Sequence, residues 1–187
     1  KQYLGIPDGT SSENTPIDNA VLAAQSEIDQ ITGRTFEVPG SATVKTFVPY
    51  DDFTLYIDDI AQKTGLIVKT DTGLDGTYDT TLTITTDFVL EGNTAPYRVV
   101  KRVDGSAYPR DRYGRPTVQV TAFWGYSMAI PDQIKQCALV IAARLYQRRS
   151  SPLGFQAGSV DVGFVRISRT DPEVIALLRG LKLPAAA

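Results

Sequence analysis

One long amphipathic segment constrains the fold of this chain more than any other feature. Residues 131–149 repeat apolar side chains at i, i+3, i+4, i+7, i+8 and i+11, the spacing of one helical face. These side chains are Ile134, Cys137, Ala138, Ile141, Ala142 and Leu145, and a second, offset row holds Leu139 and Tyr146. A helix that is apolar on more than one side needs cover from its own domain or from a neighbouring subunit.

The ends of this helix carry the expected signals. Pro131 suits the first helical turn, and Asp132 beside it favours the positive end of the helix dipole. Cations offset the negative end of the dipole, and the last turns contain Arg144, Arg148 and Arg149. We therefore predict a helix that starts at Pro131 and ends near residue 149.

Two further helices are predicted from start signals. Thr15, Pro16 and Asp18 supply a cap, a first-turn proline and an acidic first turn for a helix over residues 16–32, which Gly33 ends. Residues 170–173 repeat these signals before a short last helix. Between the last two helices, residues 152–163 are glycine-rich and predict a loop, followed by a strand over residues 164–168.

The middle of the chain has the composition of β-strands. Short runs rich in Val, Ile, Thr and aromatic residues cover residues 44–48, 55–57, 66–69, 81–85, 88–90, 97–103 and 117–124, with turn residues between them. Meander connections are expected. The sequence thus predicts an α+β fold, in which residues 1–40 and 126–187 form a core of three or four helices and residues 41–125 an inserted β-rich lobe.

The chain contains no histidine. This excludes Ser-His and Cys-His pairs, imidazole metal sites and the usual general base at neutral pH. Lysine and carboxylate chemistry remain open, but we predict no enzyme, no cofactor and no metal site. No apolar run approaches the roughly 20 residues of a membrane span, and a single cysteine, Cys137, excludes an internal disulfide.

Two patterns resemble chemical sites but fit turns better. Ser127 lies in a G-x-S-x-A pattern between a strand and a helix, the context of a hydrolase nucleophile, yet no histidine is present to take its proton. Asp71, Asp75 and Asp79 depart from the spacing of a calcium loop. We interpret all four as turn residues.

Adjacent carboxylates occur at Asp51 with Asp52 and at Asp58 with Asp59. Neighbouring strand residues point to opposite faces, so neither pair is expected to converge on a metal or a substrate. We interpret them as solvated edges or turns.

Residues 108–116 combine aromatic side chains with three cations, Arg110, Arg112 and Arg115. Such a loop suits single-stranded nucleic acid or phosphate, and as a hairpin tip it equally suits a protein partner or solvent. A nucleic-acid-binding or DNA-packaging accessory protein is therefore the alternative function.

Charge is unevenly distributed along the chain. Residues 1–40 carry two basic and six acidic side chains, whereas residues 130–187 carry eight basic and four acidic ones. The two ends can pair within one subunit, or head to tail between subunits of a ring. A pI near 5.2 argues against nucleic-acid binding by the whole surface.

Four segments follow one another in a recognisable order at the two ends of the chain. They are IDQITGRTF, VTAFWGY, AIPDQIKQCALVIAARLYQRRSSPLG and VRISRTDPEVIALLRGLK, within about residues 16–40 and 117–182. This arrangement resembles the head-to-tail connector (adaptor) proteins of long-tailed bacteriophages. The β-rich middle departs from the compact, all-helical members of that family.

The resemblance implies that the helices form a connector core in a ring of twelve identical subunits below the portal protein. The ring would extend the channel for double-stranded DNA toward a stopper or tail-terminator protein, in the neck of a virion made in the bacterial host cytoplasm. Portal contacts are implied at Leu181, Lys182, Leu183, Pro184, Arg148 and Arg149. Subunit contacts are implied at Leu139, Arg144 and Tyr146, and a lumen or downstream contact at residues 153–163.

Overall fold

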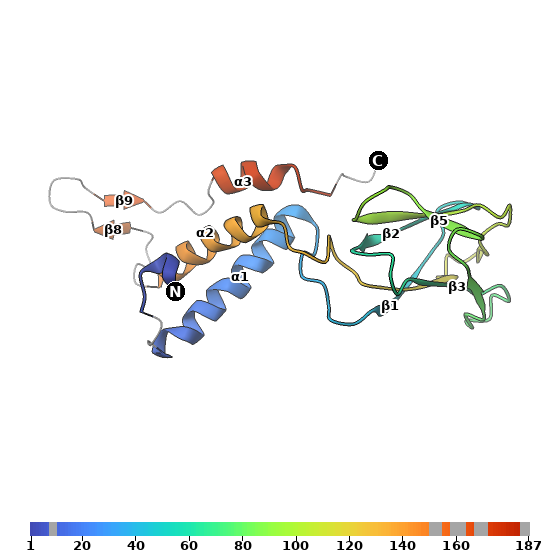
Figure 1. Ribbon diagram of the computed structural model, residues 1–187, viewed down its shortest axis with the longest axis horizontal. Coiled ribbons are helices and arrows are strands. Elements are labelled where there is room, and N and C mark those ends of the chain that lie inside the picture. Colours follow the sequence, from blue (N-terminus) through green and yellow to red (C-terminus); the bar gives the residue numbers. More distant parts are fainter. Residues whose placement is uncertain (8–10, 150–154, 158–163, 167–171, 184–187) are drawn as a thin grey trace. The chain divides into compact units, whose positions relative to one another are not determined.

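A computed structural model describes residues 1–7, 11–149, 155–157, 164–166 and 172–183. The chain divides into two compact units, one made of Lys1–Arg34 with Pro131–Ala187 and the other of Thr35–Ile130 (Figure 1). The first unit is mainly helical and the second contains antiparallel sheets, so the predicted α+β class is confirmed. The unit boundaries lie five to six residues from the expected divisions at residues 40 and 126.

The boundaries differ because residues on both sides of the insertion bind each other inside the β unit. The Tyr126 amide donates a hydrogen bond to the Thr35 carbonyl at 3.0 Å, and the rings of Phe36 and Tyr126 lie 5.2 Å apart. Gly125 packs so closely that a Cβ at this position would lie 2.7 Å from a methyl group of Val38. Local periodicity carries no information about such contacts, since they join the two ends of the insertion.

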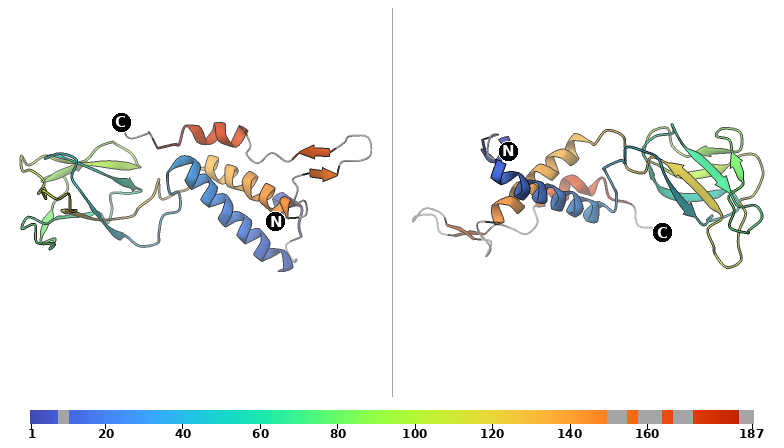
Figure 2. Two further views of the ribbon diagram at one scale, coloured as in Figure 1. Left: turned by 180° about the vertical axis from the view of Figure 1, so that it is seen from behind. Right: turned by 90° about the horizontal axis from the view of Figure 1, so that it is seen from below.

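Three α-helices form the helical unit within the described residues. Helix α1 (Asn14–Thr32) and helix α2 (Asp132–Arg148) lie side by side in opposite directions, and α3 (Pro172–Arg179) packs against both (Figure 1, Figure 2). Their shared core includes Ala24, Ile28, Cys137, Ile141 and Leu178, each at most 3% exposed. The predicted buried stripe of α2 is confirmed at Ile134, Cys137, Ile141 and Ala142, whereas Ala138 and Leu145 are half-buried.

The helix starts differ from those that the capping signals predict. Helix α1 begins two residues early, so Glu13 is its N-cap, Thr15 lies inside the first turn and Pro16 is the third helical residue. Pro131 is the N-cap of α2, one residue outside the helix. Proline is tolerated at both places because the first N–H groups of a helix have no helical acceptor. Gly33 ends α1 as predicted, with a φ of 68°.

Short elements complete the helical unit. Two 3-10 turns, η1 (Gln2–Leu4) and η2 (Ser11–Glu13), precede α1. Strands β8 (Phe155–Ala157) and β9 (Phe164–Arg166) pair antiparallel, and β8 lies inside the segment predicted as a loop, because pairing with β9 supplies the backbone partners of an extended chain. None of the described helices is both long and apolar enough to cross a lipid bilayer.

The β unit contains two antiparallel sheets. Strands β1 (Thr43–Phe47), β7 (Val118–Ala122), β3 (Ile67–Thr70) and β4 (Thr80–Leu82) form one sheet in this order, and β2 (Thr54–Ile60), β6 (Tyr97–Arg102) and β5 (Phe88–Leu90) form the other. The expected meander connections are confirmed only for β3 with β4 and for β5 with β6. They are wrong elsewhere, because β1 pairs with β7 and β2 with β6 across long stretches of sequence. The core between them includes Leu55, Val68, Phe88, Val100, Val118 and Val120, each at most 1% exposed.

Several aspartates stabilise turns of the β unit, as the sequence predicts. The Asp51 carboxylate accepts the amides of Phe53 and Thr54 at 2.8 and 2.6 Å. The buried carboxylate of Asp71 accepts the amides of Asp75 and Gly76 at 3.2 and 2.8 Å. No group of three or more acidic or Cys side chains suited to a metal ion occurs in the described part of the chain.

Asp58 and Asp59 point to opposite sides of β2, as predicted. The exposed Asp58 pairs with Lys45 at 2.6 Å. Asp59, however, is only 8% exposed and lies 3.4 Å from Arg98, which corrects its assignment to a solvated edge.

Candidate assembly interface

The C-terminal end of α2 is bound to the start of α1 by a cluster of three side chains. The Glu13 carboxylate accepts a hydrogen bond from the Tyr146 hydroxyl at 2.7 Å and pairs with the Arg149 guanidinium at 2.8 Å. The Arg149 guanidinium also lies 4.7 Å from the centre of the Tyr146 ring. Hydrogen bonds from Arg149 and Tyr146 lower the pKa of Glu13 below its usual value. Two residues expected at interfaces, Tyr146 and Arg149, thus have partners within their own subunit.

An apolar groove runs between η1, α1 and α2, with a volume of about 80 Å³. Small side chains, Ala20, Ala142 and Ala143, line it together with Tyr3, Leu4, Ile17, Val21, Leu139 and Tyr146. Leu139 is 46% exposed and Tyr3 is 56% exposed. The structure therefore brings together two of the predicted subunit contacts, Leu139 and Tyr146, at one apolar surface. The third, Arg144, is half-buried on α2, as is Arg148.

The segment that follows α3 is bound to the C-terminal end of α1. The Arg34 Nε donates a hydrogen bond to the Leu181 carbonyl at 2.7 Å, and the Leu183 amide donates one to the Thr32 carbonyl at 2.8 Å. The Leu183 side chain packs against Gly33, where an added Cβ would meet it at 3.4 Å. Three expected portal contacts, residues 181–183, therefore lie at one place, with Lys182 exposed between two half-buried leucines.

The other portal and lumen candidates are described only in part. Pro184 lies outside the described residues, as do residues 153, 154 and 158–163 of the predicted lumen contact.

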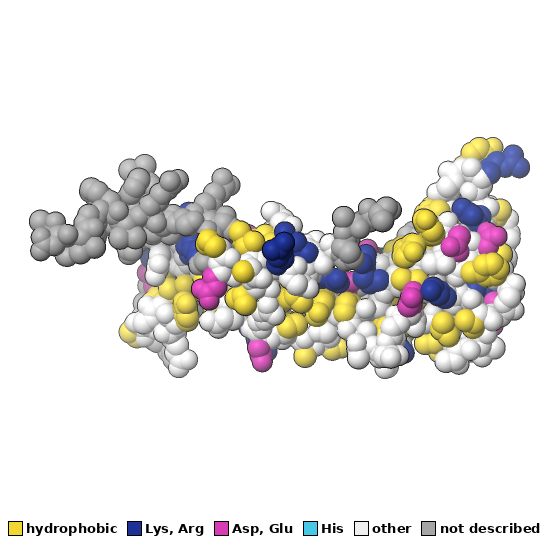
Figure 3. Space-filling view, turned by 90° about the horizontal axis from the view of Figure 1, so that it is seen from above, with side chains coloured by type: hydrophobic (Ala, Val, Ile, Leu, Met, Phe, Trp, Pro, Cys, Tyr) yellow, Lys and Arg dark blue, Asp and Glu magenta, His cyan; other side chains and the backbone are white. Residues whose placement is uncertain are grey.

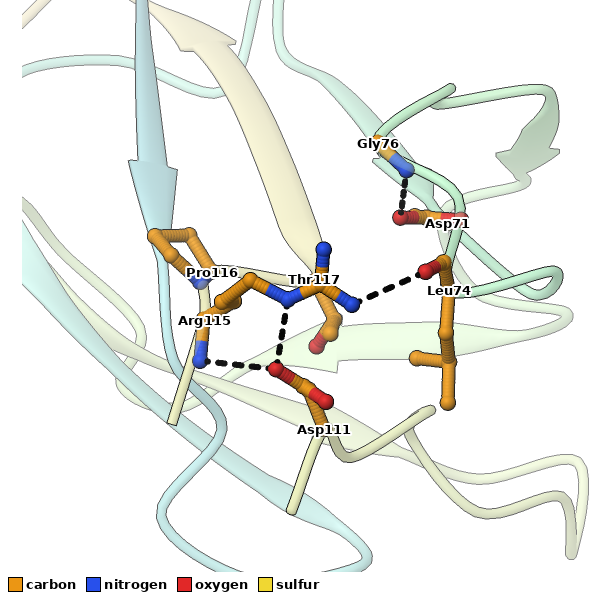
Figure 4. A pocket seen from close by; sticks show the side chains of 7 residues that line it. All are labelled: Asp71, Leu74, Gly76, Asp111, Arg115, Pro116 and Thr117. Carbon is orange, nitrogen blue, oxygen red and sulfur yellow. Dashed lines mark hydrogen bonds and ion pairs between the residues drawn. The ribbon is translucent and has the colours of Figure 1, made fainter. Parts of the chain in front are cut away.

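The arginine loop of the β unit is largely charge-balanced. Arg115 binds the Asp111 carboxylate at 2.7 Å and the Leu74 carbonyl at 3.0 Å, beside a cavity of about 190 Å³ (Figure 4). The hydrogen bond from the Arg115 guanidinium lowers the pKa of the Asp111 carboxyl below its usual value. Arg110 lies 3.5 Å from the Asp52 carboxylate and donates a hydrogen bond to the Tyr50 carbonyl.

Arg112 is the third cation of this loop, and its guanidinium lies 6.0 Å from the centre of the exposed Tyr113 ring. The structure thus brings the three predicted arginines to one loop but pairs two of them with carboxylates. A surface that follows a nucleic-acid backbone needs a row of cations whose charge is available to phosphates.

Ser127 has the turn role predicted for it. Its hydroxyl donates a hydrogen bond to the Ala129 carbonyl, two residues along the chain. This contact occupies the proton that a nucleophile would have to release to a base.

Sequence reasoning missed the partners that organise both ends of the helical unit, Glu13 and Arg34. Each partner lies more than a hundred residues away in the sequence. Glu13 precedes an expected helix start, where a carboxylate is ordinary. No local signal could have assigned either role, because the contacts arise only when α1, α2 and α3 pack together.

No protein-family model matches the chain, and no curated protein matches it significantly. Three solved chains that share the fold come from gene transfer agent (GTA) particles. A chain in the neck of an empty GTA particle, computed with C6 symmetry, has a TM-score of 0.61 and 19% identity, with 100% of this chain and 88% of that chain covered.

Two further chains agree with this likeness. One, in the virion of the native GTA particle, has a TM-score of 0.56 and 20% identity and covers 100% of this chain and 88% of its own. Another, in the neck of the native particle computed with C12 symmetry, has a TM-score of 0.55 and 18% identity and covers 91% and 84%. The protein therefore shares its fold with chains of GTA particles over nearly its whole length.

Proposed function

We propose that this protein is a structural component of the neck of a phage-like particle and acts as a head-to-tail connector (adaptor). The observation that carries the proposal is the fold shared with chains of GTA necks over 91% to 100% of this chain. The order of motifs at the two chain ends, which resembles phage adaptors, supports the same function independently. The protein would act in the virion, after synthesis in the host cytoplasm.

A ring of identical subunits is the assembly we propose. The C6 and C12 symmetries used for the similar necks support a ring, and C12 agrees with the twelve subunits implied by the sequence resemblance. The apolar groove with Leu139 and Tyr146 supports a further contact with another chain. Alanine side chains line this exposed apolar surface and leave room for a bulky side chain of the partner.

The partners we propose are the portal protein above the ring, a stopper or tail-terminator protein below it and double-stranded DNA in its lumen. Portal docking is assigned to Lys182 and the residues after it. The hydrogen bond from Arg34 to the Leu181 carbonyl and that from the Leu183 amide to the Thr32 carbonyl support this assignment, because they hold the start of this segment in one conformation before docking. Arg148 is proposed as a second portal contact. Arg149 would join this contact only if its ion pair with Glu13 opened.

The test is assembly with the portal protein of the same particle, followed by electron microscopy. We expect rings seated on the portal with the full chain and none with a chain that lacks residues 182–187. A chain that carries Arg112→Ala in the β unit is the matched control and is expected to assemble normally. Absence of rings with the full chain would refute the proposed function.

The alternative, a nucleic-acid-binding accessory protein, has weaker support. It predicts DNA binding that falls steeply with salt and is lost when Arg110, Arg112 and Arg115 are replaced by alanine. The carboxylate partners of Arg110 and Arg115 argue for weak binding. We propose no catalytic activity, since the chain has no histidine and the Ser127 hydroxyl is used in a turn.

A further inference from the structure

The outward side of α1 carries an exposed leucine next to an acidic side chain. Asp18 and Leu22 lie four residues apart on one stripe of the helix, opposite the buried side chains of Ala20, Ala24 and Ile28. Leu22 is 62% exposed, more than any other large aliphatic side chain of the described helices. Asp18 is exposed and has no ion pair within the part of the chain that the structure describes. We call these two residues the α1 stripe.

Helix α3 presents the complementary combination at the same spacing. Ile175 is 40% exposed and Arg179 is exposed, four residues further along the helix, with the exposed Lys182 after it. The packing of α3 on its own subunit uses Val174 and Leu178, so Ile175 and Arg179 remain at the surface. Apolar side chains lie beside Lys and Arg side chains over the helical unit (Figure 3). We call Ile175 and Arg179 the α3 stripe.

We propose that the α1 stripe of one subunit binds the α3 stripe of the next subunit, with Leu22 against Ile175 and Asp18 against Arg179. This inference rests on the proposed ring and names two surfaces that build it. Four residues of α-helix rise about 6 Å, so both contacts form together when the two helices run antiparallel. The charge pair selects the partner and the register, while the apolar pair loses its exposure to water.

The two stripes are different surfaces of one subunit, so the contact is heterologous. An open row of subunits always has one unpaired α1 stripe at one end and one unpaired α3 stripe at the other, however many copies it contains. Only closure into a ring pairs every stripe. A subunit in isolation cannot satisfy its own Leu22, since this side chain faces away from the helices that pack on α1. The pairing thus explains why both stripes stay exposed in one subunit.

Cysteine pairs test the proximity of the stripes. The full-length variants Leu22→Cys and Ile175→Cys are assembled on the portal protein, alone and as an equimolar mixture, and then oxidised. The native Cys137 is 0% exposed and does not compete. We expect disulfide-linked dimers in the mixture and none with either variant alone. Rings that form in the mixture without linked dimers would overturn the proposal.

Charge reversal tests whether the pair of Asp18 and Arg179 contributes to the affinity between subunits. We expect Asp18→Arg or Arg179→Glu to reduce the affinity between subunits about tenfold, and the combination of both to restore it to within about twofold. Glu91→Lys, an exposed reversal in the β unit, is the control and should leave assembly unchanged. Equal assembly by both single variants and the wild type would overturn the pairing and leave the proposed function intact. Failure of the wild type to form rings would overturn both.

Discussion

Gly125 has a φ of 147°, a conformation that residues with a side chain rarely adopt, and it touches Val38 at the start of the β unit. We expect Gly125→Ala to lower the free energy of unfolding of this unit by about 2 to 4 kcal/mol, through backbone strain and a clash with Val38. Urea denaturation followed by the fluorescence of Trp124, the single tryptophan, measures this. Gly114→Ala, at a φ of 72° with no atom within 4 Å, should cost only about 1 kcal/mol. Equal losses of unfolding free energy in the two variants would contradict the close packing of Gly125 against Val38.

Asp104 makes the stability of the β unit depend on pH. The Arg102 guanidinium, whose side chain is only 7% exposed, lowers the pKa of Asp104 to about 2 from its ordinary 3.8. Because the pKa is lower in the folded state, the stabilisation is complete above about pH 4 and is lost as the pH falls toward 2. We expect the melting temperature of the wild type to fall more steeply over this range than that of Asp104→Asn. Parallel curves of melting temperature against pH for the two proteins would show that the pair of Arg102 and Asp104 contributes nothing to stability.

At the scale of elements, α3 depends on tertiary contacts. It has eight residues, too few to be stable alone, and Leu178 is 0% exposed beneath it. We expect Leu178→Ala to weaken its docking by about 2 to 4 kcal/mol, which would speed amide hydrogen exchange in α3 about a hundredfold. Leu177→Ala, at a side chain that is 36% exposed, is the control and should cost less than about 1 kcal/mol. Similar exchange rates in the two variants would contradict the assigned packing.

The elements also show why the pairing of distant strands was not predicted. Runs rich in Val, Ile, Thr and aromatic residues, bounded by turn residues, located every strand of the β unit to within a few residues, because this signal is local. It contains no information about which strands pair, and β1 finds β7 only through contacts far apart in the sequence. Likewise, the helix signals located α1 and α2 but not the hydrogen bond and ion pair by which Glu13 joins them.

At the scale of the whole molecule, the β unit is one continuous segment with its own core. We therefore expect an isolated Thr35–Ile130 segment to fold without the helical unit. A dispersed amide NMR spectrum and one cooperative thermal transition would confirm this, and a spectrum of an unfolded chain would contradict it. The helical unit is the matched comparison: it joins two distant segments, so Lys1–Arg34 alone should remain unfolded.

The sequence by itself determined the α+β class, the places of the helices and of the strands in the β unit, the absence of histidine chemistry and the resemblance to phage adaptors. The first three follow from local periodicity, turn residues and composition, and the resemblance rests on the order of four sequence segments at the two ends of the chain. Only the tertiary structure decided the pairing of the strands, the binding of residues 181–183 to the end of α1 and the internal use of Arg110, Arg115, Tyr146 and Arg149. The physical reason is that all of these contacts except the i,i+4 pair of Arg115 with Asp111 join groups distant in the sequence. The partners of such groups are chosen by packing rather than by neighbouring residues.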